Sequence, residues 1–272
     1  MKTLLLAGGD RRMACLAEKL EQQGFLVDTM GLRPKEVHTR TADAVLFAYP
    51  FSVKNGRIPT LAGGPLKPED VLNAVDPTAL IIAGKGMEGY LRQDLPNLKR
   101  YTDAKNFEQR NAELSAEAAV CEAMLHCRLA LMDAKVLVTG YGLFGRAVCL
   151  RLKALGAQVW VAARREKQRM QAVEDGMQAV SIVEMADVLA QMDLILNTVP
   201  ARIFGEYHLK RIPKGCWLLE TASAPYGFDA DTAKAMGVAC VQLPGLPARY
   251  SPESAALALY EAVMELLREA DR

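Results

Sequence analysis

The segment 135–165 constrains the fold of this chain more than any other part of the sequence. It reads KVLVTGYGLFGRAVCLRLKALGAQVWVAARR, the pattern of an apolar strand, a glycine turn, a helix and a second apolar strand. Gly140, Gly142 and Gly145 stand in the turn at G-x-G-x-x-G spacing. That spacing alone is weak evidence, because glycines cluster in any turn. Inside a β-α-β unit it predicts a dinucleotide-binding site.

Each glycine of this turn has its own expected role. Gly140 turns the chain, Gly142 lets the backbone approach a pyrophosphate, and Gly145 lets the helix pack closely on the strand. The helix N-terminus then faces the phosphates. Residues that follow later strands are expected to border the same ligand, because ligands bind at the carboxyl ends of strands in doubly wound sheets. The predicted cofactor contacts are Gly140, Gly142, Leu143, Phe144, Gly145, Arg164, Arg165, Thr198, Val199, Pro200 and Ala222.

The end of the second strand indicates which nicotinamide cofactor is bound. NAD sites usually carry Asp or Glu there, about 20 residues past the fingerprint, to hold the ribose 2′-hydroxyl. This chain has Arg164 and Arg165 and no carboxylate at that place. Guanidinium groups match phosphate geometry, so we expect NADP(H) rather than NAD(H). The alternative is an ordinary solvated arginine pair in a loop.

Composition excludes several classes of protein. The chain has 272 residues and a net charge of +1, so it is long enough for two domains and has no basic surface suited to nucleic acid. No apolar stretch is long enough to span a membrane. The six cysteines include no C-x-x-C pair, which favours free thiols in a reducing cytoplasm. No spacing of histidines or cysteines suggests a metal site.

The expected fold is α/β, with two Rossmann-like doubly wound domains joined by a long helix. Residues 1–103 are predicted to form a flavodoxin- or Rossmann-like substrate domain, and residues 131–250 the NADP-binding domain. Residues 104–130 are predicted to form the linking helix, with Asp103 as its N-cap. Residues 251–272 form an amphipathic C-terminal helix. Helices of this kind often cross back to the first domain, and the sequence leaves that open.

The first predicted helix begins with an unusual charge pattern. Asp10 follows Gly8-Gly9 and is a natural N-cap. Arg11 and Arg12 then place positive charge in the first helical turn, where the helix dipole disfavours cations. They either point to water or hold an anionic ligand.

Local motifs make the chain resemble a known family, the A subunits of bacterial dipicolinate synthases. The resemblance spans nearly the whole chain, and the first motif and the two late loops are its most specific parts. The matching motifs are Gly8-Gly9-Asp10-Arg11, Asn111-Ala112 with Ser115-Ala116-Glu117, the fingerprint through Arg164, Asn197-Thr198-Val199-Pro200-Ala201, and the loops 222–229 and 243–252.

The resemblance implies a dehydrogenase-like subunit that works with a flavoprotein-like B subunit during sporulation. Its substrate would be a cyclic dicarboxylate, a hydroxytetrahydrodipicolinate or dihydrodipicolinate, oxidised by NADP to dipicolinate. We also expect a homo-oligomer. The chain departs from the family pattern at Tyr226 and Ala248, where glycine is expected, and at Arg249, where lysine is expected. The segment 253–256 also departs from it.

Such chemistry needs cations for two carboxylates and a group that moves a proton. Arg11, Arg12 and Arg249 are the carboxylate candidates, and Glu117 and Asp229 are the candidates for proton transfer. Asp10, Asn111 and Ser223 complete the predicted substrate site. Glu117 has the alternative of a solvated helix face. Two other functions stay open: a D-2-hydroxy-acid dehydrogenase-like enzyme, and a non-catalytic NADP-binding component of a complex.

Overall fold

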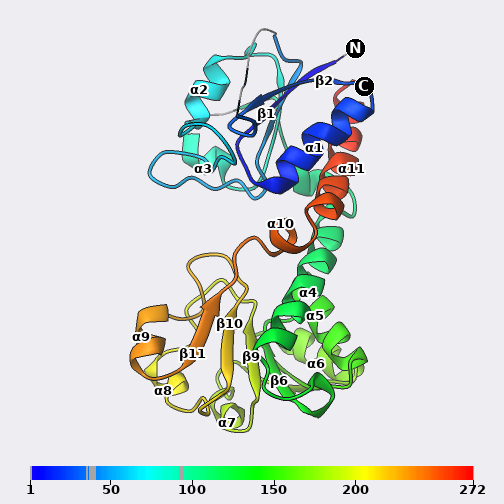
Figure 1. Ribbon diagram of the computed structural model, residues 1–272. Coiled ribbons are helices and arrows are strands. Elements are labelled where there is room, and N and C mark those ends of the chain that lie inside the picture. The colour runs from blue at the N-terminus through cyan, green and yellow to red at the C-terminus, as the bar shows by residue number, and fades with distance from the viewer. Residues whose placement is uncertain (1, 35, 37–40, 92–94, 272) are drawn as a thin grey trace. The chain divides into compact units, whose positions relative to one another are not determined.

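The structure is a computed structural model that describes residues 2–34, 36, 41–91 and 95–271. The chain divides into two compact units, each an α/β sandwich built on a parallel sheet (Figure 1). The first unit combines Met1–Asn111 with Pro247–Arg272, and the second is Ala112–Leu246. The division falls inside helix α4 (Phe107–His126). This architecture confirms the predicted pair of doubly wound α/β domains.

In the described part of the chain, the first unit has a five-stranded sheet in the order β2-β1-β3-β4-β5. All of its strand pairs are parallel, and the order is that of flavodoxin-like sheets. Its strands are β1 (Thr3–Ala7), β2 (Leu26–Met30), β3 (Ala44–Phe47), β4 (Leu80–Ala83) and β5 (Leu98–Arg100). Its helices are α1 (Arg11–Gln22), α2 (Pro68–Asn73), α3 (Met87–Leu91), the 3-10 helix η1 (Tyr101–Asp103), α10 (Leu246–Tyr250) and α11 (Pro252–Ala270).

The C-terminal helix α11 belongs to the first unit. It lies beside α1 (Figure 1). Both helices bury apolar side chains, among them Leu16 and Leu259. The backbone N–H of Lys105 also donates to the carboxylate of Glu265, at 3.1 Å from Oε2. The C-terminal helix therefore packs on the first unit, which the sequence alone left open.

The second unit has a six-stranded parallel sheet in the order β11-β10-β9-β6-β7-β8 among its residues, all of which are described. This is the strand order of dinucleotide-binding Rossmann folds. Its strands are β6 (Lys135–Thr139), β7 (Gln158–Ala162), β8 (Gln178–Val180), β9 (Leu194–Asn197), β10 (Trp217–Glu220) and β11 (Ala239–Gln242). The other elements are η2 (Leu131–Asp133), α5 (Leu143–Ala154), α6 (Glu166–Glu174), α7 (Ala186–Leu189), α8 (Glu206–Leu209) and α9 (Ala230–Ala235).

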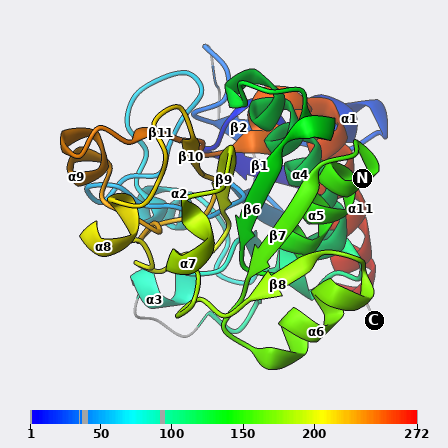
Figure 2. The ribbon, with the colours of Figure 1, turned by 90° about the horizontal axis from the view of Figure 1, so that it is seen from below.

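Helices cover both faces of this second sheet (Figure 2). One face packs against α4, α5 and α6 through buried residues such as Ala119, Val148 and Ala172. The other packs against α7, α8 and α9 through residues such as Leu189 and Leu209. Burial on both faces explains why the strands are continuous apolar runs rather than alternating ones.

Two local predictions are corrected by the structure. Asp103 does not cap the long helix: it ends η1, where its Oδ2 accepts a hydrogen bond of 2.7 Å from the Arg100 N–H, and α4 begins only at Phe107. The sequence pattern also predicts a helix over residues 182–191, but the helix there is limited to α7 (Ala186–Leu189), because the chain after β8 first makes a turn held by Ser181 and Glu184. Within the described residues, no helix combines the length and apolar character needed to cross a bilayer.

Candidate functional site

The turn between β6 and α5 requires glycine at two places and leaves a third open. Gly140 has φ +87°, and a Cβ there would lie 2.7 Å from Thr198 Oγ1. A Cβ on Gly145 would meet the carbonyl oxygen of Gly140, so α5 packs on the turn as closely as backbone allows. At Gly142 a Cβ would meet no atom within 4 Å. The open side of Gly142 is the space that a pyrophosphate needs in folds of this kind.

A cavity of about 610 Å³ opens in front of this turn. Ten of the eleven predicted cofactor contacts line it, and the eleventh, Ala222, does not. Their roles stay predictions, because lining a cavity does not show what fills it. The lining residues that were not among the predicted cofactor contacts are Tyr141, Gln168, Ile182, Ala201 and Ile203.

Two guanidinium groups stand at one side of the cavity. Arg164 and Arg165 follow β7, line the cavity and are exposed. Among the residues that the structure describes, neither has a carboxylate partner. Arg169 fixes the backbone beneath them, since its Nη1 donates to the carbonyl oxygens of Ala163 at 3.1 Å and Arg164 at 2.9 Å. The arrangement offers two unneutralised cations on a backbone that is held in place.

The first turn of α5 carries a third arginine, and this one is neutralised. Arg146 donates to both carboxylate oxygens of Asp175 at 2.7 and 3.1 Å. Asp175 also accepts a 2.7 Å hydrogen bond from the Tyr141 hydroxyl. The bond from Arg146, followed by that from Tyr141, lowers the pKa of Asp175 to about 2. Burial, followed by the bond to Asp175, raises the pKa of Tyr141. The cluster fixes one wall of the cavity through Tyr141.

A buried polar row joins the carboxyl ends of three neighbouring strands. Thr139 of β6, Asn197 of β9 and Glu220 of β10 are register partners, and none is more than 1% exposed. The Thr139 hydroxyl donates to Asn197 Oδ1 at 2.5 Å, and Asn197 Nδ2 donates to Glu220 Oε1 at 2.7 Å. The sequence did not single out this row. The one feature of the sequence that could have indicated this row is that a polar residue ends each of three otherwise apolar strands.

The turn after β1 places the first group of predicted substrate residues. Asp10 is the N-cap of α1, as predicted, and its Oδ1 accepts a 3.1 Å hydrogen bond from the Arg12 N–H. The Arg12 side chain, only 4% exposed, donates to both carboxylate oxygens of Asp10 at 2.9 and 2.6 Å. Arg11 is exposed. Asp10 therefore both neutralises Arg12 and caps the helix.

The remaining predicted residues are spread over both units. Asn111 in α4 and Arg249 in α10 belong to the first unit, and Ser223 is an exposed residue of the loop after β10. Glu117 is an exposed residue of α4 whose carboxylate lies 3.6 Å from Arg151 Nη2. Asp229 caps α9 by accepting from the Thr232 N–H, and this bond is the first cause of its lowered pKa. A lowered pKa makes the Asp229 carboxylate a weaker base.

The backbone of the loop after β10 shows why the family pattern has glycine at position 226, where this chain has tyrosine. Tyr226 adopts φ +61°, in the left-handed region that favours glycine. Gly227 follows it and is buried, and a Cβ there would press on the side-chain amide of Asn197. The expected glycine at position 226 would thus fit the backbone without strain, whereas tyrosine costs about 1–2 kcal/mol in this conformation.

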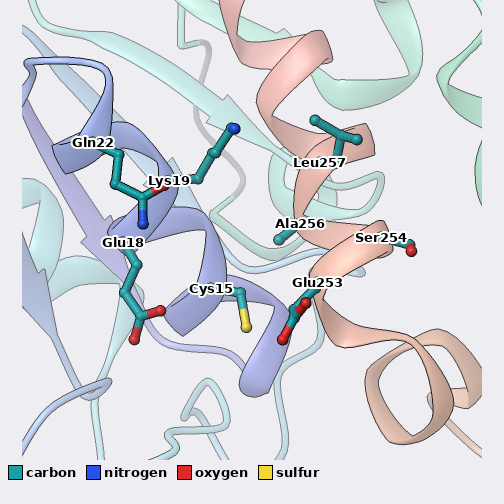
Figure 3. Close-up of a pocket in the computed structure, with 8 residues that line it drawn as sticks. All are labelled: Cys15, Glu18, Lys19, Gln22, Glu253, Ser254, Ala256 and Leu257. Atoms are coloured by element: carbon teal, nitrogen blue, oxygen red, sulfur yellow. The ribbon is translucent and has the colours of Figure 1, made fainter.

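A second cavity, of about 460 Å³, lies between α1 and α11 in the first unit (Figure 3). Cys15 lines it together with Glu18 and Glu253, and none of the predicted site residues does. Burial raises the pKa of the Cys15 thiol, and the two carboxylates raise it further. The raised pKa makes the Cys15 thiol less readily ionised and so a poorer nucleophile.

Comparison with known proteins agrees with this geometry. The A subunit of the Bacillus subtilis dipicolinate synthase is 22% identical over 98% of this chain and 96% of its own length. The crystal structure of the corresponding Bacillus halodurans protein has a TM-score of 0.84 at 24% identity, covering 98% of this chain and 97% of that one. A Salmonella D-lactate dehydrogenase has a TM-score of 0.68 at 12% identity, covering 99% and 97%.

These likenesses confirm the predicted resemblance to the A subunits of dipicolinate synthases and the dehydrogenase-like fold. Residues 101–271, well over half of the chain, match the family model of the D-isomer specific 2-hydroxyacid dehydrogenase NAD binding domain. A fingerprint turn with an open Gly142, a cavity in front of it and a matching family model agree on one conclusion: this chain belongs to the D-isomer specific 2-hydroxyacid dehydrogenase family, through its NAD binding domain.

Proposed function

We propose that this protein is an NADP(H)-dependent oxidoreductase that forms the A component of a dipicolinate synthase. The observation that carries the proposal is the cavity at the β6–α5 turn, which is lined by the open Gly142 and by two arginines without carboxylate partners among the described residues. Its relatives include proteins named as dipicolinate synthases, which supports the choice of substrate. NADP(H) and the pyridine dicarboxylate are both part of the proposal.

The residues around the cavity fit a phosphorylated dinucleotide. The turn Gly140–Gly145 would hold the pyrophosphate, and Arg164 and Arg165 would hold the ribose 2′-phosphate. No carboxylate stands at the end of β7 to bind a free 2′-hydroxyl, which is the feature that NAD sites use. When bound, NADP⁺ accepts a hydride from the substrate. NAD(H) is the alternative cofactor, and titration with each nucleotide would distinguish the two.

The proposed substrate is a dihydro- or hydroxytetrahydropyridine dicarboxylate. The hydroxytetrahydro compound would first lose water to give the dihydro ring. The dihydro ring would then become aromatic by giving one hydride to the cofactor and releasing one proton. Arg11 is the first candidate for a substrate carboxylate, because it is exposed, whereas the charge of Arg12 is balanced by Asp10. The other proposed substrate residues are Asp10, Arg12, Asn111, Ser223 and Arg249.

Proton release does not need a strong base in this reaction, since formation of the aromatic ring drives it. Glu117 and Asp229 are the proposed acceptors. Glu117 is the better of the two, because Asp229 has a lowered pKa and its carboxylate is committed to capping α9.

The proposal also includes a partner, the flavoprotein-like B subunit, together with a homo-oligomer and action in the cytoplasm of a sporulating cell.

The cofactor is tested by titrating the protein with NADP⁺ and NAD⁺ in a calorimeter. The variant Arg164→Ala/Arg165→Ala should lose about 100-fold in NADP⁺ affinity and little in NAD⁺ affinity, because only the 2′-phosphate loses its charge-assisted bonds. Arg268→Ala, which changes an exposed arginine of α11, is the matched control and should bind as the wild type does. Equal affinity of wild type and double variant for NADP⁺ would contradict the assignment of the two arginines.

The reaction is tested with NADP⁺ and freshly prepared hydroxytetrahydrodipicolinate or dihydrodipicolinate, by following NADPH absorbance. We expect turnover, and a higher KM for the cyclic dicarboxylate in Arg11→Ala. No NADPH with or without the B subunit, in a protein that binds NADP⁺, would instead favour the non-catalytic role in a complex. Turnover of a small D-2-hydroxy acid in place of the ring substrate would favour the D-2-hydroxy-acid dehydrogenase alternative.

A further inference from the structure

The polar row Thr139–Asn197–Glu220 is buried at the carboxyl edge of the second sheet, contains one ionisable group, and has no part in the proposed chemistry. Glu220 is 1% exposed, and burial raises its pKa against the effect of its hydrogen bonds. A carboxylate is costly to bury unless its oxygens are fully bonded. The hydrogen bonds that the Glu220 carboxylate accepts must therefore offset the cost of burying it.

Three N–H donors converge on the Glu220 carboxylate. Its Oε1 accepts from Asn197 Nδ2 at 2.7 Å and from the Ala222 N–H at 3.0 Å, and its Oε2 accepts from the Gly227 N–H at 2.6 Å. Glutamine has the same shape but offers one oxygen and one NH₂ group, so it would place a donor against a donor. The loop 221–227 therefore requires glutamate at position 220, because the carboxylate accepts hydrogen bonds from backbone N–H groups near both ends of this loop.

Asn197 connects this loop to the loop that lines the cofactor cavity. Its Oδ1 accepts from the Val199 N–H at 3.1 Å, and its Nδ2 donates to the Val199 carbonyl oxygen at 3.0 Å. Val199 lines the cavity. On the other side, Gly227 packs so closely that a Cβ would lie 2.7 Å from Asn197 Cγ. One amide side chain is therefore clamped between the two loops.

We propose that Glu220 is a positioning residue that, through Asn197, holds the loops 198–201 and 221–227 in place for the nicotinamide half of the cofactor. The inference rests on the proposed binding of NADP(H). In a doubly wound fold each half of the sheet takes one mononucleotide. The fingerprint turn and Arg164–Arg165, on β6 and β7, serve the adenosine half, and β9 and β10, which carry Asn197 and Glu220, serve the other half.

This division predicts a selective defect. Glu220→Gln should weaken binding of NADPH about tenfold, because one of the donors that Glu220 satisfies is left against an NH₂ group and the loops shift. Binding of adenosine 2′,5′-bisphosphate, which has no nicotinamide, should stay within about twofold of the wild type. The measurements are NADPH fluorescence titration and calorimetry with the bisphosphate. Glu206→Gln, on the exposed start of α8, is the matched control and should change neither.

Two further variants protect the test against a folding defect in Glu220→Gln. Glu220→Asp keeps the charge one methylene shorter and should bind NADPH better than Glu220→Gln. Gly227→Ala leaves Glu220 intact but pushes on Asn197, and should reproduce the selective loss of NADPH affinity. Circular dichroism establishes which variants are folded.

The outcomes separate this inference from the function on which it rests. Equal loss of both ligands in the folded variants means general loosening of the domain and overturns the positioning role. Unchanged affinity for NADPH in Glu220→Gln and Gly227→Ala overturns it as well. A wild-type protein that binds neither NADPH nor the bisphosphate overturns the proposed cofactor itself, whereas binding of both with no selective defect removes only the role of Glu220.

Discussion

Each unit has a glycine turn at the same place in its fold, between its first strand and its first helix. In the first unit the turn is Gly8-Gly9-Asp10, and in the second it is Gly140-Tyr141-Gly142. The surroundings of the two turns differ. A Cβ on Gly9 would lie 2.5 Å from Met13 Cγ, and one on Gly8 would lie 2.8 Å from the Pro59 carbonyl oxygen. The first turn is filled by its own chain, whereas Gly142 faces open space.

Both helices that follow also carry an arginine in the first turn, against the helix dipole. Arg12 of α1 is neutralised by Asp10, only two residues away, which also caps the helix. Arg146 of α5 is neutralised by Asp175, which stands at the end of α6, and the N-cap Gly142 has no side-chain bond. The carboxylate that neutralises Arg12 is itself the cap of α1. The carboxylate that neutralises Arg146 comes from another element and leaves the N-cap of α5 without a side-chain bond.

Loss of the Asp10 carboxylate should have the largest effect on the free energy of unfolding. Asp10→Ala removes the cap of α1 and leaves the Arg12 guanidinium buried without its partner, so it should destabilise the protein by about 2–4 kcal/mol. Urea denaturation measures the change. Asp70→Ala, an exposed first-turn acid of α2, is the control and should cost less than about 1 kcal/mol. A cost of Asp10→Ala no larger than that of Asp70→Ala would contradict the double role of Asp10 as the cap of α1 and the partner of Arg12.

Alanine substitutions at Gly9 and Gly142 should have different effects, because the first turn is filled by its own chain and the second faces open space. Gly9→Ala is expected to destabilise by about 1–3 kcal/mol, because Gly9 has φ +118° and Met13 fills the space. Gly142→Ala should change stability by less than about 0.5 kcal/mol and yet weaken NADPH binding at least about tenfold, since the Cβ occupies the space proposed for the pyrophosphate. Thermal unfolding and NADPH titration measure the two effects. Unchanged NADPH affinity in Gly142→Ala would mean that the open side is not used by this ligand.

A weaker effect is expected at the remote carboxylate, and it depends on pH. The pKa of Asp175 is about 2 in the folded protein and about 3.9 when unfolded, so the unfolded state binds more protons in between. Its contribution is complete above about pH 4 and is lost as the pH falls toward 2. Asp175→Asn should therefore cost about 1–2 kcal/mol at neutral pH and progressively less toward pH 2. A loss of stability in Asp175→Asn that stays constant across this pH range would contradict the lowered pKa of Asp175. The control is Asp187→Asn, on the exposed side of α7.

Local patterns were enough to predict the parts of the site that lie close together in the sequence. Strand, turn and helix of the fingerprint follow each other within a few residues, so glycine spacing could be read directly against known turn geometry. Arg164 and Arg165 follow the next strand for the same reason. The long helix was also predicted, although its start was wrong, because the 3-10 helix η1 uses Asp103 for its own bonds.

Contacts between distant segments could not be predicted in this way. Arg146 meets Asp175 across 29 residues, and Thr139 meets Asn197 across 58. The short strand β8 was also missed, since three residues carry too little periodicity to be recognised.

The order of amino acids was sufficient to establish a dinucleotide fingerprint in an α/β chain and the lack of a carboxylate at the end of its second strand. Tertiary packing was needed to show that Gly142 opens onto a cavity, that α11 returns to the first unit, and that Glu220 and Asn197 hold two loops together. The physical reason is register. A strand's apolar pattern shows that it is buried, but only its pairing with neighbours decides which polar residues meet at the carboxyl edge of the sheet.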